Sequence, residues 1–289
     1  MGRFLNYTLL ASVPTFTAIY YTQKTQIYTG PYLEKNPFDE SKYSLAQRLK
    51  YKILGNNDNV IHSKSFKLTN PNGNTPSFDH YEQTLDKETT AKVLAKHKTN
   101  EEILKLIEKG YFKGPTLWFH QYALSAYFQF KSPFNRIAGF TAWEPELKKL
   151  DVSKLPKTAI FDFPLLPENK DLKYVWKASA VEKEKGLLPL NTVVYGLFDV
   201  IDYGKRTSGG YYDVSFGSDL LPATMIHRFE YEIVENQKHE QNLVFRLTNV
   251  SQFTAPTKNI FTDETGGLHE FMTRTIVQDI IREVRNSVN

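Results

Sequence analysis

The sequence predicts an α+β fold in which a curved antiparallel sheet grips one long C-terminal helix. Three observations predict this fold. A capping box at Thr99 opens a helix, six segments of strand-like composition follow within residues 158–249, and apolar residues recur at helical spacing from Gly266 to Val288. The chain has 289 residues, of which 40% are hydrophobic, and this is enough for one sizeable core.

The domain is expected to begin with a strand. Residues Val60–Leu68 alternate apolar and polar side chains over part of their length, which is typical of a half-buried strand. The turn formers Asn70–Asn74 predict a loop after it. Upstream, we expect a short helix at Ser41–Leu54.

Two helices are expected next, at Asp86–Lys96 and from Thr99 onward. The Thr99 hydroxyl can accept a hydrogen bond from the backbone of Glu102, whose carboxylate can reach back to the backbone of Thr99. We expect Gly110 to end this second helix, because glycine is the usual residue just after a helix.

The second half of the chain is expected to be mostly strands. Because no helix-length insert separates the last four segments, we expect them to pair antiparallel. The candidate strands are Thr158–Phe163, Tyr174–Val181, Thr192–Asp202, Tyr211–Ser215, Ile226–Glu235 and Asn242–Asn249.

Residues 111–143 are the densest aromatic zone of the chain. Such a zone is core, the lining of a lipid-sized pocket, or a surface that contacts a membrane. The sequence leaves these three interpretations open.

The first residues carry a separate signal. Phe4–Gln23 contains no charged residue and is close to the ~20 apolar residues that cross a bilayer. A membrane anchor, an organelle-targeting presequence and a buried segment of the fold all remain open. We divide the chain into an anchor or targeting segment at 1–24, a linker at 25–59 and the α+β domain at 60–289. The net charge of +4 suits a mitochondrial matrix protein or one that touches anionic lipid. We expect association with a mitochondrial membrane, or else with another intracellular membrane.

Composition excludes several functional classes. The chain has no cysteine, which excludes disulfides, thiolate catalysis and cysteine-ligated metals. Its seven histidines show no metal-binding spacing, so we expect neither a metal nor a cofactor. No basic block carries interleaved aromatic residues, so we expect no nucleic-acid partner.

One polar group stands out at His227, Arg228 and Glu230. On a strand, Arg228 and Glu230 share a face, and His227 points to the other face together with Phe229. The histidine is then a satisfied core residue or an acid–base group, and Arg228–Glu230 is expected as a solvated ion pair. Lys205–Arg206 is expected at a loop tip, either solvated or touching phospholipid headgroups.

The expected order is a strand, two helices, an antiparallel run and a final helix. In this order the chain resembles the START-like helix-grip superfamily over residues 60–288. The segment Thr207–Tyr231 is similar to an uncharacterised subfamily of that group. The residues that carry this likeness are Ser208–Gly209–Gly210, Gly217–Ser218–Asp219 and His227–Arg228–Phe229–Glu230. The resemblance implies a cavity between sheet and final helix that holds a lipid, sterol or quinone-like ligand.

Three functions are compatible with these observations. The first is a membrane-tethered protein that binds or transfers an apolar ligand. The second is a structural or assembly protein of an organelle membrane with a filled core. The third is an enzyme that uses the same cavity, with His227 as acid or base and Arg228 orienting an anionic group. The residues expected to line the cavity are Trp118, Tyr122, His227, Phe229, Phe271, Met272, Ile276 and Ile280.

Overall fold

The computed structural model describes residues 34–35, 58–74, 76–117, 135–157, 164–221, 223–235, 240–253 and 263–289. The expected anchor segment, the helix at Ser41–Leu54 and the strand at Thr158–Phe163 lie outside these residues. Within them, no helix has the length and apolar character needed to span a membrane.

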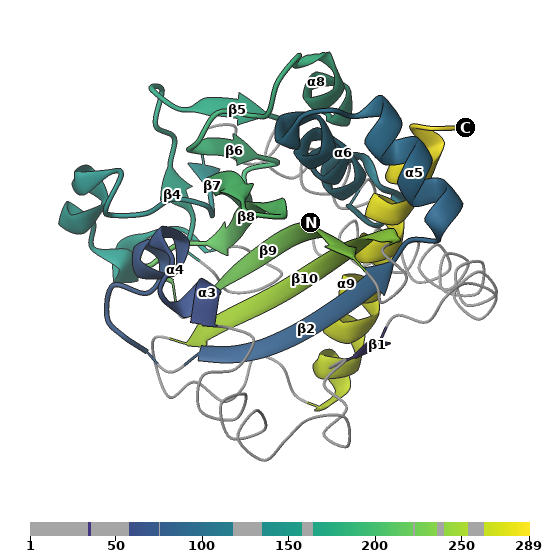
Figure 1. Ribbon diagram of the computed structural model, residues 1–289. Coiled ribbons are helices and arrows are strands. Elements are labelled where there is room, and N and C mark those ends of the chain that lie inside the picture. The colour runs from purple at the N-terminus through teal and green to yellow at the C-terminus, as the bar shows by residue number, and fades with distance from the viewer. Residues whose placement is uncertain are drawn as a thin grey trace.

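The fold is α+β, as the sequence predicts. An eight-stranded, mostly antiparallel open sheet has the order β1-β2-β10-β9-β8-β7-β6-β5, and the long helix α9 ends the chain (Figure 1). The elements before the main strand run are β1 (Glu34–Lys35), α3 (Asp58–Ile61), α4 (Lys64–Thr69), β2 (Pro76–Thr84), α5 (Lys87–Lys96), α6 (Asn100–Lys113), β3 (Asn135–Arg136), the short 3-10 helices Pro145–Lys149 and Val152–Lys154, and β4 (Leu166–Pro167). The elements after them are β5 (Lys173–Val175), α8 (Ala178–Lys183), β6 (Thr192–Val194), β7 (Phe198–Arg206), β8 (Gly209–Gly217), β9 (Ala223–Glu235), β10 (Gln241–Phe253) and α9 (Asp263–Asn286).

The strand expected at Val60–Leu68 is wrong, because this segment forms α3 and α4. Ser63 caps α4, since its hydroxyl accepts a hydrogen bond from the backbone N–H of Phe66. The first long strand is instead β2, which pairs with β1 on one side and β10 on the other. A strand still precedes the helix pair, as expected, but it lies at Pro76–Thr84.

The two predicted helices are confirmed as α5 and α6, and the capping box of Thr99 and Glu102 is present in full. The expected end at Gly110 is wrong, because α6 continues to Lys113 and Gly114 forms its C-cap. Gly110 serves packing instead. A Cβ at this position would lie 2.5 Å from the Cα of Ile280 in α9, so the missing side chain lets the two helices approach closely.

The later strands follow the prediction with two corrections. Strands β7 to β10 pair antiparallel in sequence order, as expected. The expected single strand at Thr192–Asp202 is split into β6 and β7 by a tight turn in which Tyr195 and Gly196 both have positive φ, 57° and 69°. The expected strand at Tyr174–Val181 is the short β5 followed by α8, and β5 pairs parallel with β6.

Helices cover both faces of the sheet (Figure 1). We call the face that contacts α5, α6 and α9 the inner face, and the face that contacts α3 and α4 the outer face. Side chains alternate between the faces along β9, so His227 and Phe229 point inward while Arg228 and Glu230 point outward. The larger apolar core lies on the inner face, and a smaller cluster around Val60, Phe140 and Ile226 lies on the outer face.

Candidate functional site

The inner face of the sheet is closely packed against α6 and α9. The Phe229 ring lies 4.8 Å from the Tyr111 ring, centroid to centroid. Between Phe229, Ile107 and Ile280 there is one gap of about 10 Å³, which is close to the least space that holds a single water molecule. This particular gap is therefore too small to hold a ligand.

The structure places five of the eight predicted site residues. Phe229, Ile276 and Ile280 are buried in the core, and Phe229 and Ile280 line the same small gap. His227 is 8% exposed and lies beside Phe229, with ring centroids 6.3 Å apart. Met272 is half-buried on α9. Trp118, Tyr122 and the side chain of Phe271 lie outside the described residues.

Next to this gap the inner face carries a group of buried polar side chains, which we call the inner polar cluster: Tyr111, His227, Asn249 and Thr273. His227 and Asn249 are directly opposite each other on β9 and β10. The Tyr111 hydroxyl lies 2.8 Å from His227 Nδ1, and Asn249 Nδ2 donates to Thr273 Oγ1 at 3.1 Å. The cluster thus connects both helices to the two central strands.

Two features of the inner polar cluster bear on ligand binding. Burial raises the pKa of Tyr111 well above its usual value, so the phenol stays protonated at neutral pH. Asn249 Oδ1 is buried and accepts no hydrogen bond from any described residue. Sequence reasoning found His227 but missed Tyr111 and Asn249. The alternation along residues 242–249 was the one signal that could have placed Asn249 on the face of His227.

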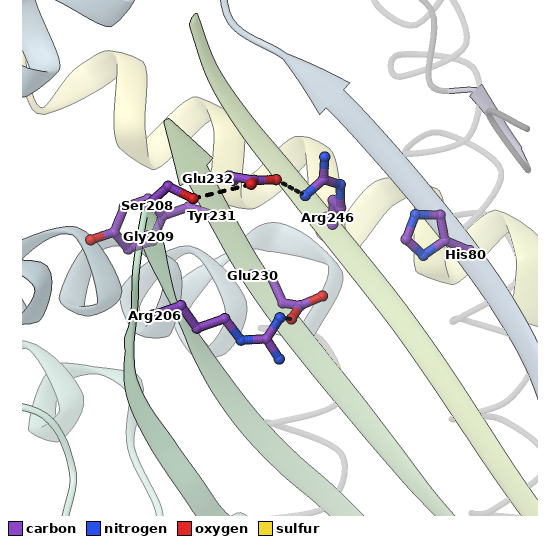
Figure 2. Close-up of a pocket in the computed structure, with 8 residues that line it drawn as sticks. All are labelled: His80, Arg206, Ser208, Gly209, Glu230, Tyr231, Glu232 and Arg246. Atoms are coloured by element: carbon purple, nitrogen blue, oxygen red, sulfur yellow. Dashed lines mark hydrogen bonds and ion pairs between the residues drawn. The ribbon is translucent and has the colours of Figure 1, made fainter. Parts of the chain in front are cut away.

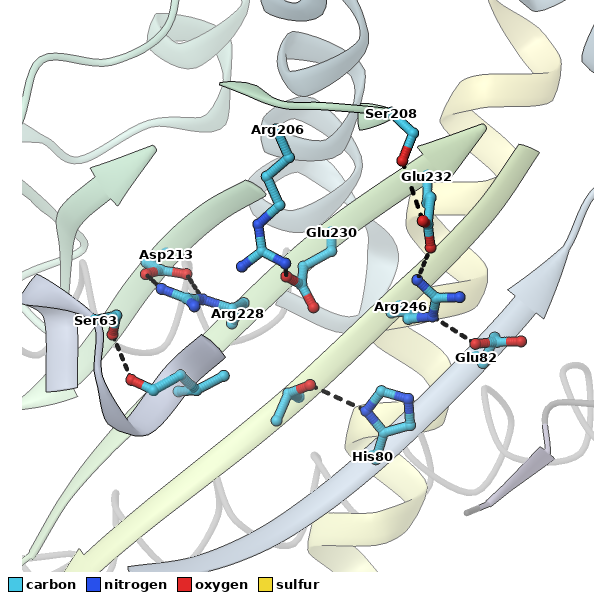
Figure 3. Close-up of polar contacts among 12 residues, drawn as sticks. Ser63, His80, Glu82, Arg206, Ser208, Asp213, Arg228, Glu230, Glu232 and Arg246 are labelled. Carbon is cyan, nitrogen blue, oxygen red and sulfur yellow. Dashed lines mark hydrogen bonds and ion pairs between the residues drawn. The ribbon is translucent and has the colours of Figure 1, made fainter. Parts of the chain in front are cut away.

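On the outer face, Arg228 forms a buried ion pair with Asp213. Arg228 Nε donates to Asp213 Oδ1 at 2.8 Å, and Nη2 donates to Oδ2 (Figure 3). The hydroxyl of Ser65 in α4 also donates to this carboxylate. The side chains of Arg228 and Asp213 are 2% and 0% exposed. Burial alone would lower the pKa of Arg228, but the carboxylate of Asp213 outweighs it and the pKa is raised. The expected solvated Arg228–Glu230 pair is therefore wrong, because Asp213 lies opposite Arg228 in the sheet register.

The outer face also holds a groove of about 290 Å³, which we call the outer groove. It lies over the ends of β7, β8 and β9 and extends across β10 to β2 (Figure 2). This volume is at the small end of ligand pockets. Its lining residues are His80, Arg206, Ser208, Gly209, Glu230, Tyr231, Glu232 and Arg246.

Charges alternate across the outer groove. Arg206 pairs with Glu230, and Arg246 donates both to Glu232 and to Glu82 of β2 (Figure 3). Ser208 Oγ donates to Glu232 at 3.1 Å. The loop tip expected at Lys205–Arg206 is wrong, because both residues belong to the end of β7. Lys205 is exposed there, while Arg206 points toward Glu230 (Figure 2).

The titratable groups of the outer groove differ in their environments. Burial raises the pKa of Glu230, against the opposing effect of the Arg206 and Arg228 charges. The hydrogen bond from Arg246 lowers the pKa of Glu232. Burial lowers the pKa of His80, so its ring is neutral at pH 7, and its Nδ1 lies 3.0 Å from Thr248 Oγ1.

The described residues contain no group of three or more histidine, aspartate or glutamate side chains placed to hold a metal ion. No protein-family model, curated protein or solved structure matched this chain.

Proposed function

We propose that this protein is a helix-grip binding protein that holds an apolar ligand against the inner face of its sheet. The order of strands carries this proposal. The first long strand, β2, is followed by the helix pair α5 and α6. The antiparallel run then returns so that its last strand, β10, pairs with β2 before α9 closes the fold. This is the element order on which the START-like resemblance rests.

The inner polar cluster supports a ligand with an apolar body and a single polar end. A buried acceptor without a partner costs roughly 1–3 kcal/mol, and Asn249 Oδ1 is such an acceptor among the described residues. A hydroxyl or N–H group of a ligand would offset that cost, while the apolar side chains around Phe229 and Ile276 would contact its hydrocarbon part. A sterol-like alcohol or a reduced quinone has this combination of groups.

Native mass spectrometry of the full chain, purified gently from its own cells, tests the proposal. We expect an additional mass in the range of lipids or quinones. An Asn249→Ala variant should retain less of that mass, whereas Asn242→Ala, on the same strand but away from the cluster, should retain it unchanged. Repeated recovery of folded protein with the bare chain mass would refute the proposal.

A tether formed by residues 4–23 belongs to the same proposal. The net charge of +4 and the uncharged N-terminal stretch support attachment to an intracellular membrane, with the mitochondrion as the proposed organelle. Alkaline carbonate extraction of mitochondria should leave the full chain in the membrane pellet and release a chain that begins at Thr25. Release of both chains would contradict the tether.

A second candidate function, as a structural or assembly protein, is favoured by the close packing around Phe229. The gap of about 10 Å³ there holds no more than one water. Under this alternative, a bare chain mass would be accompanied by a stable larger assembly in gently solubilised membranes, whereas a ligand-binding protein has no need of one.

A further inference from the structure

The outer groove is formed by the strands of the sheet and their side chains. Its floor is formed by strands far apart in sequence, and Gly209 stands between Arg206 and Glu232 in the register. The Arg206 guanidinium lies over the Tyr211 ring of β8, with Cζ 5.2 Å from the ring centroid, and reaches Glu230 of β9 (Figure 2). A Cβ at Gly209 would lie 1.8 Å from the carbonyl oxygen of Tyr231, so a larger residue is not accommodated there.

The groove contains both hydrogen-bond donors and hydrogen-bond acceptors that no described residue uses. Arg206 uses Nη1 for Glu230, and its Nε and Nη2 bond to no described residue. Arg246 uses Nε and Nη1, and its Nη2 is likewise unoccupied by any described residue. Glu230 Oε1 is buried and is within ion-pair distance of Arg206, but it accepts no hydrogen bond of good geometry within the described part of the chain.

His80 provides a further polar atom at the groove. Its side chain is 7% exposed, and its Nδ1 is engaged by Thr248. Its Nε2 is buried and has no hydrogen-bond partner among the described residues. A nearly buried ring with one unsatisfied nitrogen, in the wall of the outer groove, is placed to contact a bound molecule.

We propose that the outer groove binds a small zwitterion whose ammonium and carboxylate groups lie about 5–7 Å apart, with the ammonium against Glu230 and Glu232 and the carboxylate against Arg206 and Arg246. The separation follows from the sheet, since neighbouring strands lie ~4.8 Å apart and alternate residues of one strand ~6.7 Å apart. Positive and negative side chains alternate at this spacing across β9 and β10.

The alternation of charges distinguishes a zwitterion from simpler ions. A lone anion that approaches the two arginines also approaches two glutamates, and the repulsion opposes the attraction. A lone cation meets the converse situation at the arginines. A molecule with both charges contacts a partner of opposite sign at each end and leaves fewer donors and acceptors unpaired.

Isothermal titration of the full chain with δ-aminovalerate, valerate and pentylammonium tests this proposal, because the three probes share one carbon chain and differ only in their charged ends. We expect the zwitterion to bind at least tenfold more tightly than either singly charged probe. Equal binding of valerate would overturn the proposal in favour of a simple anion site. The absence of binding by δ-aminovalerate up to millimolar concentration would overturn it altogether.

A pair of variants separates the groove from the general charge of the surface. Arg206→Gln and Lys205→Gln each remove one positive charge from neighbouring positions, but only Arg206 lines the groove. We expect the first to weaken δ-aminovalerate binding at least tenfold and the second to leave it within twofold. If both variants weakened δ-aminovalerate binding similarly, the effect would come from the general surface charge, and the proposed site would be refuted. Since the probe series is measured on the unaltered chain, poor folding of Arg206→Gln would still leave the proposal open to refutation.

This inference is independent of the proposed function, because the two sites lie on opposite faces of the sheet. Loss of the apolar ligand from the inner face predicts no change in δ-aminovalerate binding.

Discussion

Substituting Gly110 by alanine tests the contact between α6 and α9 that closes the inner face. In an exposed helix interior this change stabilises a protein by roughly 1 kcal/mol, because alanine is the better helix former. Here the new Cβ would lie 2.5 Å from the Cα of Ile280 and 3.0 Å from its backbone nitrogen. A clash with backbone cannot be relieved by a rotamer change, so the two helices must move apart. Overpacking of this kind costs about 1–3 kcal/mol, and more when backbone must shift.

The two effects oppose each other, and the structure decides their balance. We expect Gly110→Ala to lower the free energy of unfolding by about 1–2 kcal/mol, because a contact of 2.5 Å lies far inside van der Waals distance. For a chain of this size, that corresponds to a melting temperature lower by roughly 2–8 °C. Thermal unfolding followed by circular dichroism, together with urea unfolding, measures the change.

Gly186→Ala is the matched control. Its Cβ would meet only the carboxylate of Glu101, with the nearest oxygen at 2.7 Å, and that end of a flexible side chain can move away. We expect its effect to stay within about 0.5 kcal/mol. A Gly110→Ala protein more stable than the parent would refute the described approach of α6 to α9.

Three further predictions concern buried polar groups. Arg228→Met should lower the free energy of unfolding in urea by about 3–5 kcal/mol, because it leaves Asp213 buried without its cation. Adding Asp213→Leu should recover most of this loss, and a double variant as unstable as the single one would contradict the prediction. Burial raises the pKa of the Asp199 carboxyl well above its usual value, so the folded state binds this proton more tightly than the unfolded state does. The contribution of Asp199 to the free energy of unfolding therefore falls as the pH rises from the usual aspartate range through the folded pKa. Asp199→Asn should therefore flatten the pH dependence of stability and raise stability at neutral pH, and an unchanged pH profile would count against it. Asn249→Leu removes the unpartnered acceptor of the inner polar cluster and should leave the fold within about 1–2 kcal/mol of the parent while reducing the retained apolar ligand; undiminished retention would exclude Asn249 as its contact.

Local signals allow much of the architecture to be predicted. The capping box of Thr99 and Glu102 places α6 because both partners lie within one helical turn, so no distant residue is needed. Strands β7 to β10 follow each other through short connections, so their antiparallel pairing follows from sequence order.

The errors arise where distant contacts decide the structure. Strand β2 carries Asp79, His80 and Glu82, a polar composition that hides a strand with neighbours on both sides. The charge of Glu82 on this strand is explained by Arg246 of β10, which lies opposite it and donates a hydrogen bond to its carboxylate. Gly110 resembles a helix stop in the sequence because its partner, Ile280, is 170 positions away along the chain.

The same reasoning explains why the polar group at 227–230 is only partly predictable. The alternation of faces follows from the strand, but the partner of each side chain depends on register with β8 and β10. Asp213 lies opposite Arg228 and takes it as a buried partner, so Glu230 is left for Arg206. Neighbouring residues of β9 therefore belong to different sites. His227 contributes to the inner polar cluster, and Glu230 contributes to the outer groove.

This division makes β9 the element on which both proposals depend and gives them a common test. A substitution at His227 should alter retention of an apolar ligand and leave the affinity for δ-aminovalerate unchanged, whereas Glu230→Gln should do the reverse. Both substitutions are on one strand and leave its backbone pairing intact, so a general loss of sheet structure would affect both measurements together. A variant at either position that keeps the sheet folded but equally impairs ligand retention and δ-aminovalerate binding would show that the faces are not independent, and it would refute the assignment of two sites.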